Sequence, residues 1–408
     1  MSRYFNVAGP CSSEEHYMLD AIGRLDDVLP LIEQKKYFII HAARQSGKTT
    51  FLLEVEQKLN QSGKYYALYC SLENIQGIDD ADTGIPRIVG NLSFALRSST
   101  IPHSEQFAID TGADKNMPML YKVLSDFCSL LDKPLVLFFD EADCLSGGTM
   151  ISFLRQLRNG FVTRNKLPFI HSLALVGMLN INEYKMHYRS DSESLGTASP
   201  FNVISESLTL KNFSKEEIDK LYAQHTADTG QQFDPDAVEL AWQQTQGQPW
   251  LVNAIAREAV EKIFKSDYSQ VVTSEIIEQA IQNIILRRDT HIESLMARLK
   301  EKRIRDILQA IILGADDEID RFADDFRFTR DLGLIREDDG VIKFANQIYE
   351  DVIVRTLNFN TQIKLQNNST YQPLRYINDG QIDMNQLLID FQEFWRMNGE
   401  IWQEKYEY

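Results

Sequence analysis

A short segment that places a glycine directly before a lysine and two threonines has the pattern of a phosphate-binding loop. Residues 42–50 read Ala-Ala-Arg-Gln-Ser-Gly-Lys-Thr-Thr. They fit the pattern Gly-x-x-x-x-Gly-Lys-[Ser/Thr] except at Ala42, which is compatible only if its φ stays negative. In such a loop, backbone N–H groups surround the phosphates, Lys48 neutralises their charge and the Thr49 hydroxyl holds Mg²⁺. The predicted nucleotide-binding residues are Ala43, Arg44, Gln45, Ser46, Gly47, Lys48, Thr49 and Thr50.

Two adjacent carboxylates follow an apolar strand further along the chain. Residues 135–139 read Leu-Val-Leu-Phe-Phe, and Asp140 and Glu141 come next. At the carboxyl edge of a parallel sheet Asp140 would hold Mg²⁺ through water, and Glu141 would act as the base for an attacking water. Solvated acids at a strand end are the alternative reading, which the loop at 42–50 makes less favoured. Lys48, Thr49, Asp140 and Glu141 together predict Mg²⁺-dependent ATP hydrolysis.

The elements that must position these residues alternate along the first half of the chain. Apolar runs at 37–40, 65–70, 135–139 and 172–176 predict strands, and segments such as 48–61 and 150–159 predict helices. Continuous apolar strands between helices are typical of a parallel sheet covered on both faces, the three-layer α/β fold.

The second half predicts helices and one hairpin. After about residue 205 the strands stop, and a Ser-x-x-Glu capping box at 214–217 begins a helical region. Residues 287–357 read as helices followed by a hairpin with a turn at 338–340, the outline of a winged helix. The predicted domains are a P-loop core (1–205), a helical lid (206–286), a winged helix (287–357) and a C-terminal helical tail (358–408).

The charge of the chain disfavours a general nucleic-acid binder. The 408 residues include 42 Lys and Arg against 59 Asp and Glu, a net charge of −17, whereas phosphate backbones attract basic surfaces. The winged-helix residues 291–356 contain more acidic than basic side chains, and their one basic segment, 296–306, is predicted to be a helix.

Four scattered cysteines indicate neither a disulfide framework nor a zinc site. No signal peptide or spanning segment is predicted, and we expect a cytoplasmic protein without membrane contact.

The loop at 42–50 and the Asp140-Glu141 pair resemble the additional-strand-Glu branch of the P-loop ATPases. More narrowly, the chain resembles bacterial AAA-like ATPases of the STAND group, the signal-transduction ATPases with numerous domains. The narrower resemblance covers essentially the whole chain and rests on residues 9–10, 16–17, 43–50, 71–73, 153–158, 199–202, 224–226, 247–253, 287–291 and 332–336.

The resemblance implies roles for two further segments. Gly247 and Pro249 resemble the Gly-x-Pro element of a helical lid that approaches the bound nucleotide. The same residues also read as a helix stop followed by a proline-started helix, and both readings can hold together. Residues 8–17 resemble a segment that packs near the adenine, although Gly9 and Pro10 also fit a plain turn.

Two departures from the relatives qualify this prediction. Leu179 stands where relatives carry an arginine that senses the γ-phosphate, so Asn180, or Arg155 and Arg158 on the preceding helix, would have to supply that contact. Loss of such a cation slows phosphoryl transfer, and slow turnover is therefore expected. Relatives often continue into a PD-(D/E)xK nuclease-like domain, for which the last residues offer no matching carboxylates and lysine.

The sequence thus predicts an ATP- and ADP-binding, Mg²⁺-dependent switch that relays its nucleotide state to a protein partner or to a second copy. A scaffold that binds nucleotide without significant hydrolysis is the alternative, favoured by Leu179. A DNA-associated ATPase is a third reading, which the net charge opposes.

Overall fold

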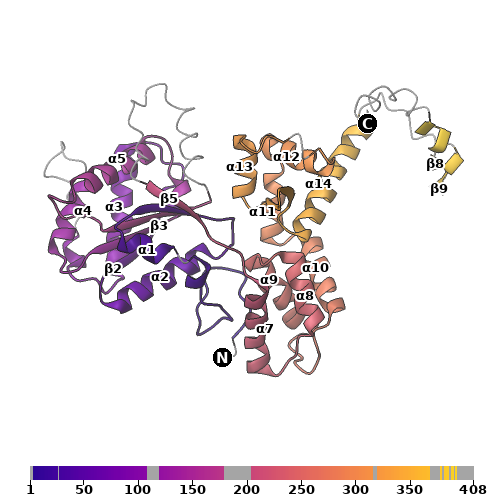
Figure 1. The fold of residues 1–408 in the computed structure, drawn as a ribbon, viewed down its shortest axis with the longest axis horizontal. Helices are drawn as coiled ribbons and strands as arrows, with labels where there is room; N and C mark the ends of the chain where they lie inside the picture. Colours follow the sequence, from indigo (N-terminus) through magenta and orange to yellow (C-terminus); the bar gives the residue numbers. More distant parts are fainter. Residues whose placement is uncertain are drawn as a thin grey trace. The chain divides into compact units, whose positions relative to one another are not determined.

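The chain forms two compact units, residues 1–353 and 354–408. The computed structural model describes residues 3–25, 27–107, 119–178, 204–315, 319–367, 377–378, 381–385, 387–389 and 391–392. The α/β part of the first unit (Figure 1) contains η1 (Ile22–Arg24), α1 (Val28–Glu33), β1 (Tyr37–His41), α2 (Lys48–Ser62), β2 (Tyr66–Ser71), η2 (Glu73–Ile75), α3 (Ala81–Arg97), η3 (Ser104–Gln106), α4 (Met119–Leu130), β3 (Leu135–Asp140), η4 (Ala142–Cys144), α5 (Gly147–Thr163), β4 (Ser172–Gly177) and β5 (Ile204–Thr209).

The sheet of the α/β part is parallel and has five described strands in the order β2-β3-β4-β1-β5. Strand β4 lies between β1, which leads into the loop at 42–50, and β3, which ends in Asp140. A strand in this place is what the resemblance to the additional-strand-Glu ATPases implies. Because all carboxyl ends of parallel strands meet at one edge, the loop and Asp140 emerge side by side.

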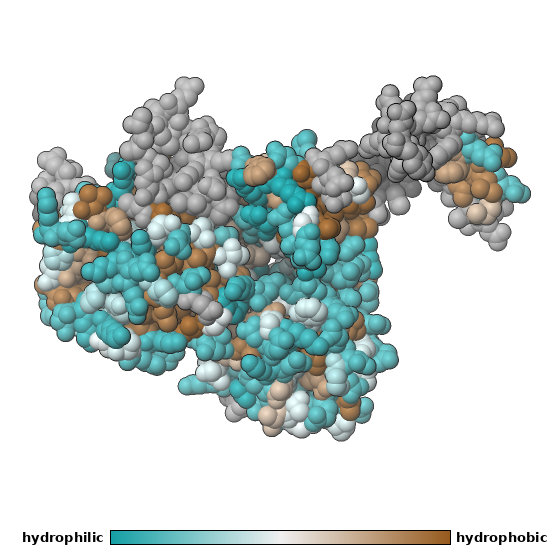
Figure 2. Space-filling model, in the orientation of Figure 1, coloured by the Kyte–Doolittle hydropathy of each residue, from teal (hydrophilic) through white to brown (hydrophobic). Residues whose placement is uncertain are grey.

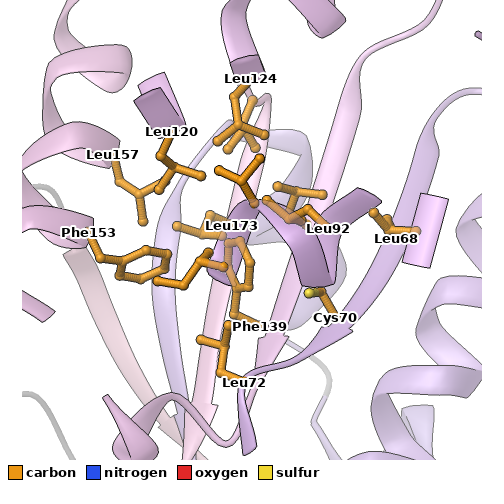
Figure 3. Packing of buried hydrophobic residues seen from close by; sticks show 14 of the residues in the cluster. Leu68, Cys70, Leu72, Leu92, Leu120, Leu124, Phe139, Phe153, Leu157 and Leu173 are labelled. Atoms are coloured by element: carbon orange, nitrogen blue, oxygen red, sulfur yellow. The ribbon is translucent and has the colours of Figure 1, made fainter. Parts of the chain in front are cut away.

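Alternate side chains of each strand pack on opposite faces of the sheet. Phe38 and Ile40 of β1 pack with α1 and α2, whereas Tyr37 and Ile39 pack with α3, α4 and α5. Figure 3 shows the second of these cores, where Phe139 of β3 lies among side chains of the surrounding helices. Helices cover both faces of the sheet in Figure 1. The predicted three-layer α/β fold is confirmed.

Strand β5 corrects the prediction that strands stop near residue 205. It pairs with β1 at the edge of the sheet and ends at Thr209. The segment reads Ile-Ser-Glu-Ser-Leu-Thr, and most of its side chains are exposed. An edge strand with a solvated surface lacks the apolar run that marks the other strands, so hydrophobicity does not reveal it. The predicted boundary at 205 therefore falls inside an element of the sheet.

Helices dominate the rest of the first unit, in two regions that we name for reference. The middle helical region contains α7 (Lys215–Thr229), α8 (Pro235–Thr245), α9 (Pro249–Arg257), η6 (Glu258–Ile263) and α10 (Ser274–Arg287). The helix–hairpin region contains α11 (Thr290–Arg298), α12 (Lys302–Ile312), α13 (Asp324–Asp331), β6 (Ile335–Asp338), β7 (Val341–Phe344) and the first residues of α14 (Gln347–Asn367).

Local signals in these two regions are confirmed, with one correction. The capping box at Ser214 and Glu217 is present, and Asp339 and Gly340 both have positive φ in the hairpin turn. The basic segment 296–306 is not one helix, because α11 ends at Arg298 and α12 begins at Lys302. Neither glycine nor proline marks that break, so the helical period continues through it in the sequence. A winged helix stays a prediction for the helix–hairpin region.

The second unit contains the end of α14 and the antiparallel pair β8 (Ile377–Asn378) and β9 (Gln381–Ile382). Helix α14 crosses the predicted domain boundary at 357, and the pair of strands departs from the predicted helical tail. No helix among the described residues is long and apolar enough to cross a membrane. Hydrophilic residues dominate the visible face of α7 to α10 (Figure 2).

Candidate functional site

The loop between β1 and α2 is shaped by two residues in the left-handed conformation. Gln45 has a φ of 57° and Gly47 a φ of 86°, whereas Ala42 does not have a positive φ, so alanine fits the first position of the motif. Gly47 is also the N-cap of the 15-residue helix α2 and gives its first N–H groups no side-chain acceptor. The Ser46 Oγ is buried without a partner among the described residues. These uncapped donors suit an anion at the helix N-terminus.

Lys48 lies under this loop and is already oriented by it. Its Nζ donates to the carbonyl oxygens of Ala42 at 3.2 Å and Ala43 at 3.1 Å. Burial lowers the pKa of Lys48, while the nearby carboxylates of Glu141, Asp140 and Asp143 raise it. A buried ammonium facing weak neutral acceptors gains most from an added negative charge.

The predicted metal-binding pair is in direct contact. The Thr49 hydroxyl donates to Asp140 Oδ2 at 2.7 Å. The carboxylate of Asp140 is only 1% exposed and also accepts from the Tyr69 hydroxyl at 3.1 Å and the Glu141 backbone at 3.0 Å. Three donors fix this carboxylate next to the loop, the arrangement expected for a residue that orients the water ligands of Mg²⁺.

The described residues do not form a complete metal cage. No group of three or more His, Cys, Asp or Glu side chains within the described ranges is arranged to hold a metal ion. Mg²⁺ keeps several waters and takes further oxygens from the phosphates of a substrate, so Thr49 and Asp140 fit it as the protein's share of the ligands. Tyr69, which holds the Asp140 carboxylate, was not predicted from the sequence.

Glu141 follows Asp140 in a strained conformation. Its φ is 55°, which is uncommon for a residue with a side chain. Burial raises the pKa of Glu141, and the charge of Asp143 raises it further. A carboxylate whose pKa is raised toward neutrality is a better proton acceptor at physiological pH.

Asp143 is a neighbouring carboxylate that the sequence analysis missed. Its Oδ2 accepts from the backbone N–H of Met178, just after β4, at 3.4 Å. Its Oδ1 is buried and has no hydrogen-bond partner among the described residues, and burial raises its pKa. Asp143 therefore joins the Asp140-Glu141 corner to the end of β4. Leu179 and Asn180, where the sequence analysis placed the γ-phosphate sensor, lie outside the described residues.

A cavity of about 690 Å³ extends from the loop and Glu141 to the N-terminal segment. In that segment, Asn6 accepts from the Ala8 backbone at 3.0 Å, and the Cys11 N–H donates to Thr50 Oγ1 at 3.0 Å. The Trp250 indole of α9 donates to the Val7 carbonyl at 2.9 Å. A volume of this size is sufficient for a nucleotide. The wall formed by residues 6–11 lies partly within the segment predicted to pack near the adenine.

The Gly-x-Pro element of the middle helical region contacts the loop through its central residue. Gln248 caps α9 by accepting from Leu251 at 2.6 Å, and its Nε2 donates to the Gln45 carbonyl at 3.3 Å. Pro249 is the first residue of α9 and lines the cavity. Gly247 has a φ of 71°, and a Cβ there would lie 1.8 Å from the Phe213 carbonyl oxygen. Gly247 therefore shapes the turn and is not part of the cavity wall.

The side chain of Gln45 joins the loop to the helix–hairpin region. Its Oε1 lies 2.5 Å from Nδ1 of His291, whose Nε2 lies 2.6 Å from the Tyr349 hydroxyl. A neutral imidazole satisfies both contacts if Nδ1–H donates to Gln45 and Nε2 accepts from Tyr349. The ring also stacks on Trp250 with centroids 4.8 Å apart. We call Gln45, Gln248, His291 and Tyr349 the joint.

Most of the predicted site residues lie in the loop or line the cavity beside it. Asp140 contacts Thr49 directly, and Ala43 and Ser46 belong to the same loop. Arg155 and Arg158 on α5, weighed as alternative sensors, do not line the cavity. The predicted residues that line it are Arg44, Gln45, Gly47, Lys48, Thr49, Thr50, Glu141 and Pro249. His291 stood in a segment of family resemblance, but only the fold shows its contact with Gln45.

Acidification is expected to weaken the joint through His291. Burial lowers the pKa of His291 to about 4, below the usual value of about 6.5 in an unfolded chain. The stability from keeping this ring neutral is fully present above pH 6.5 and is lost as the pH falls toward 4. Between pH 7 and pH 4.5 wild type should lose about 2 to 3 kcal/mol more unfolding free energy than His291→Gln. Urea unfolding at both pH values measures it.

The matched control is His103→Gln, which makes the same substitution at an exposed histidine. An equal pH dependence in His291→Gln and wild type would contradict the assigned protonation state.

Comparisons with known proteins concern the fold and the family of the chain. The fold is similar to that of a Walker-type ATPase of Pyrococcus abyssi, with a TM-score of 0.58 at 14% identity over 86% of this chain and 99% of that chain. The ORC2 protein of Aeropyrum pernix, solved as ADPNP-ADP complexes, gives a TM-score of 0.49 at 13% identity over 88% and 97% of the two chains. No curated protein sequence matches the chain. The AAA-like domain family matches residues 26–354, and the chain belongs to this family.

Proposed function

We propose that this chain binds ATP with Mg²⁺, hydrolyses it slowly and uses the nucleotide state as a switch of the STAND type. The observation that carries the proposal is the contact between Thr49 and Asp140 at 2.7 Å, beside a buried Lys48 and a half-buried Glu141. A phosphate-binding loop alone would support binding. The adjacent carboxylates add a metal-binding residue and a base, which hydrolysis requires.

Each residue has one task in the proposed reaction. The N–H groups of the loop and Lys48 bind the phosphates, and Thr49 and Asp140 hold Mg²⁺. When bound there, Mg²⁺ would neutralise part of the charge on the phosphates. Glu141 accepts a proton from a water molecule while the oxygen of that water bonds to the γ-phosphorus. The bond from the γ-phosphorus to the β–γ bridging oxygen breaks, leaving ADP and phosphate.

The joint supports the switch part of the proposal. Phosphates bound by the loop lie next to Gln45, whose carbonyl and side chain contact the middle helical region and the helix–hairpin region. A ligand shifts a conformational equilibrium by its difference in affinity for the two states. Nucleotide that favours one loop conformation therefore biases both regions, and a protein partner or second copy would read the result.

Two alternatives to the hydrolysing switch are a nucleotide-bound scaffold and a DNA-associated ATPase. Leu179 in place of a sensor arginine favours a nucleotide-bound scaffold with negligible hydrolysis. The net charge of −17 opposes a DNA-associated ATPase. Turnover of purified protein with ATP separates the scaffold from the enzyme.

Lys48→Ala should weaken ATP binding at least about 100-fold, because no other described lysine lines the cavity. Titration of a fluorescent ATP analogue measures the affinity, with Lys58→Ala on the exposed face of α2 as the matched control. Wild-type affinity in a folded Lys48→Ala variant would exclude the phosphate-loop assignment.

Glu141→Gln should keep ATP affinity within about threefold and lower turnover by about 100-fold or more, since the amide retains the shape but accepts no proton. Phosphate release under saturating ATP measures turnover, and Glu33→Gln at the exposed end of α1 is the control. If Glu141→Gln loses ATP binding together with turnover, Glu141 is instead a structural residue.

A further inference from the structure

A pair of arginines from the helix–hairpin region reaches the wall of the nucleotide cavity. Arg298 at the end of α11 and Arg303 at the start of α12 line the same cavity as Lys48 and Glu141. The two arginines therefore flank the break between the two helices. No binding site was predicted for this basic segment from the sequence.

The carboxylate of Glu301 holds both arginines. Arg298 Nη1 lies 2.8 Å from Glu301 Oε1, and Arg303 Nε lies 3.6 Å from Glu301 Oε2. The three side chains are 33% to 37% exposed, so the cluster is reached by solvent and by solutes. Ion pairs this exposed are weak and exchange partners readily. Phosphate binds guanidinium through paired, charge-assisted hydrogen bonds and competes well with one carboxylate.

The orientation of α11 directs Arg298 toward the loop. His291 contacts Gln45, and Ser294 Oγ accepts from Arg44 Nη1 at 3.3 Å. Positions 291, 294 or 295, and 298 lie on one face of a helix, so Arg298 continues the face that touches the loop. Met178, at the end of β4 where γ-phosphate sensing is expected, lines the cavity together with Arg298.

Arg303 is oriented by a separate contact. Its guanidinium lies over the Phe328 ring of α13, 3.3 Å from the centroid, and Phe328 also lines the cavity. A planar guanidinium stacked on an aromatic ring keeps its edge N–H groups directed outward.

We propose that Arg298 and Arg303 bind the terminal phosphate of ATP in cis, with Glu301 as the partner they exchange when the γ-phosphate is absent. This inference rests on the proposed nucleotide site. It supplies from the helix–hairpin region the cation that Leu179 does not provide. It also gives that region a contact that ATP makes and ADP does not, so it distinguishes the two nucleotides.

Calorimetric titration with ADPNP and with ADP tests the proposal. The double variant Arg298→Gln/Arg303→Gln should lose about tenfold or more in ADPNP affinity, keep ADP affinity within about twofold and hydrolyse ATP about 100-fold more slowly. Glu301→Gln should strengthen ADPNP binding several-fold, because it removes the negative charge that pairs with both guanidiniums. Lys302→Gln, a charge change in the same segment on a highly exposed side chain, is the control and should match wild type.

Each outcome separates this inference from the proposed function. Nucleotide binding by wild type with an unchanged ADPNP-to-ADP affinity ratio in the double variant would overturn the arginine proposal alone. Failure of wild type to bind either nucleotide would overturn the proposed function itself. If loss of the Phe328 contact unfolds the double variant, Arg298→Gln alone must show the selective ADPNP loss, and a wild-type ratio there overturns the proposal.

Discussion

The left-handed conformation of Gln45 is the constraint on which the rest of the site depends. At a φ of 57° its carbonyl faces Gln248 and its side chain faces His291. The same turn sets the path of the loop over Lys48 and into α2. One residue therefore fixes both the phosphate-binding surface and the contacts of the middle helical and helix–hairpin regions. Strained backbone of this kind persists only where surrounding contacts determine it.

Charged side chains at and beside the cavity include one acidic and one basic group. Asp140 ends β3, Glu141 follows it and Asp143 lies within η4, with the buried Lys48 beside these carboxylates. Arg298 and Arg303 approach from α11 and α12, held by Glu301. An anionic ligand with a bound divalent cation compensates both groups at once. Because the two groups come from distant parts of the chain, such a ligand links them energetically.

Local features of the fold and site could be predicted from the sequence, and long-range ones could not. The loop and the Asp140-Glu141 pair are contiguous motifs beside continuous apolar strands, so their places at the sheet edge follow from topology. Strand β5 was not predicted, because its exposed polar residues do not form an apolar run. Tyr69, Asp143 and His291 act through partners that only folding brings near. The break between α11 and α12 was not predicted, because residues 299–301 contain no helix breaker.

We infer that nucleotide bound at the loop changes the conformation of the middle helical region and the helix–hairpin region through the joint. Amide hydrogen exchange with ADP and with ADPNP tests it most directly, read at residues 43–50, 246–253 and 290–303. Both nucleotides should slow exchange at 43–50 and 246–253, and ADPNP should slow exchange at 290–303 more than ADP does. Slowed exchange confined to residues 43–50 with both nucleotides would contradict the claim.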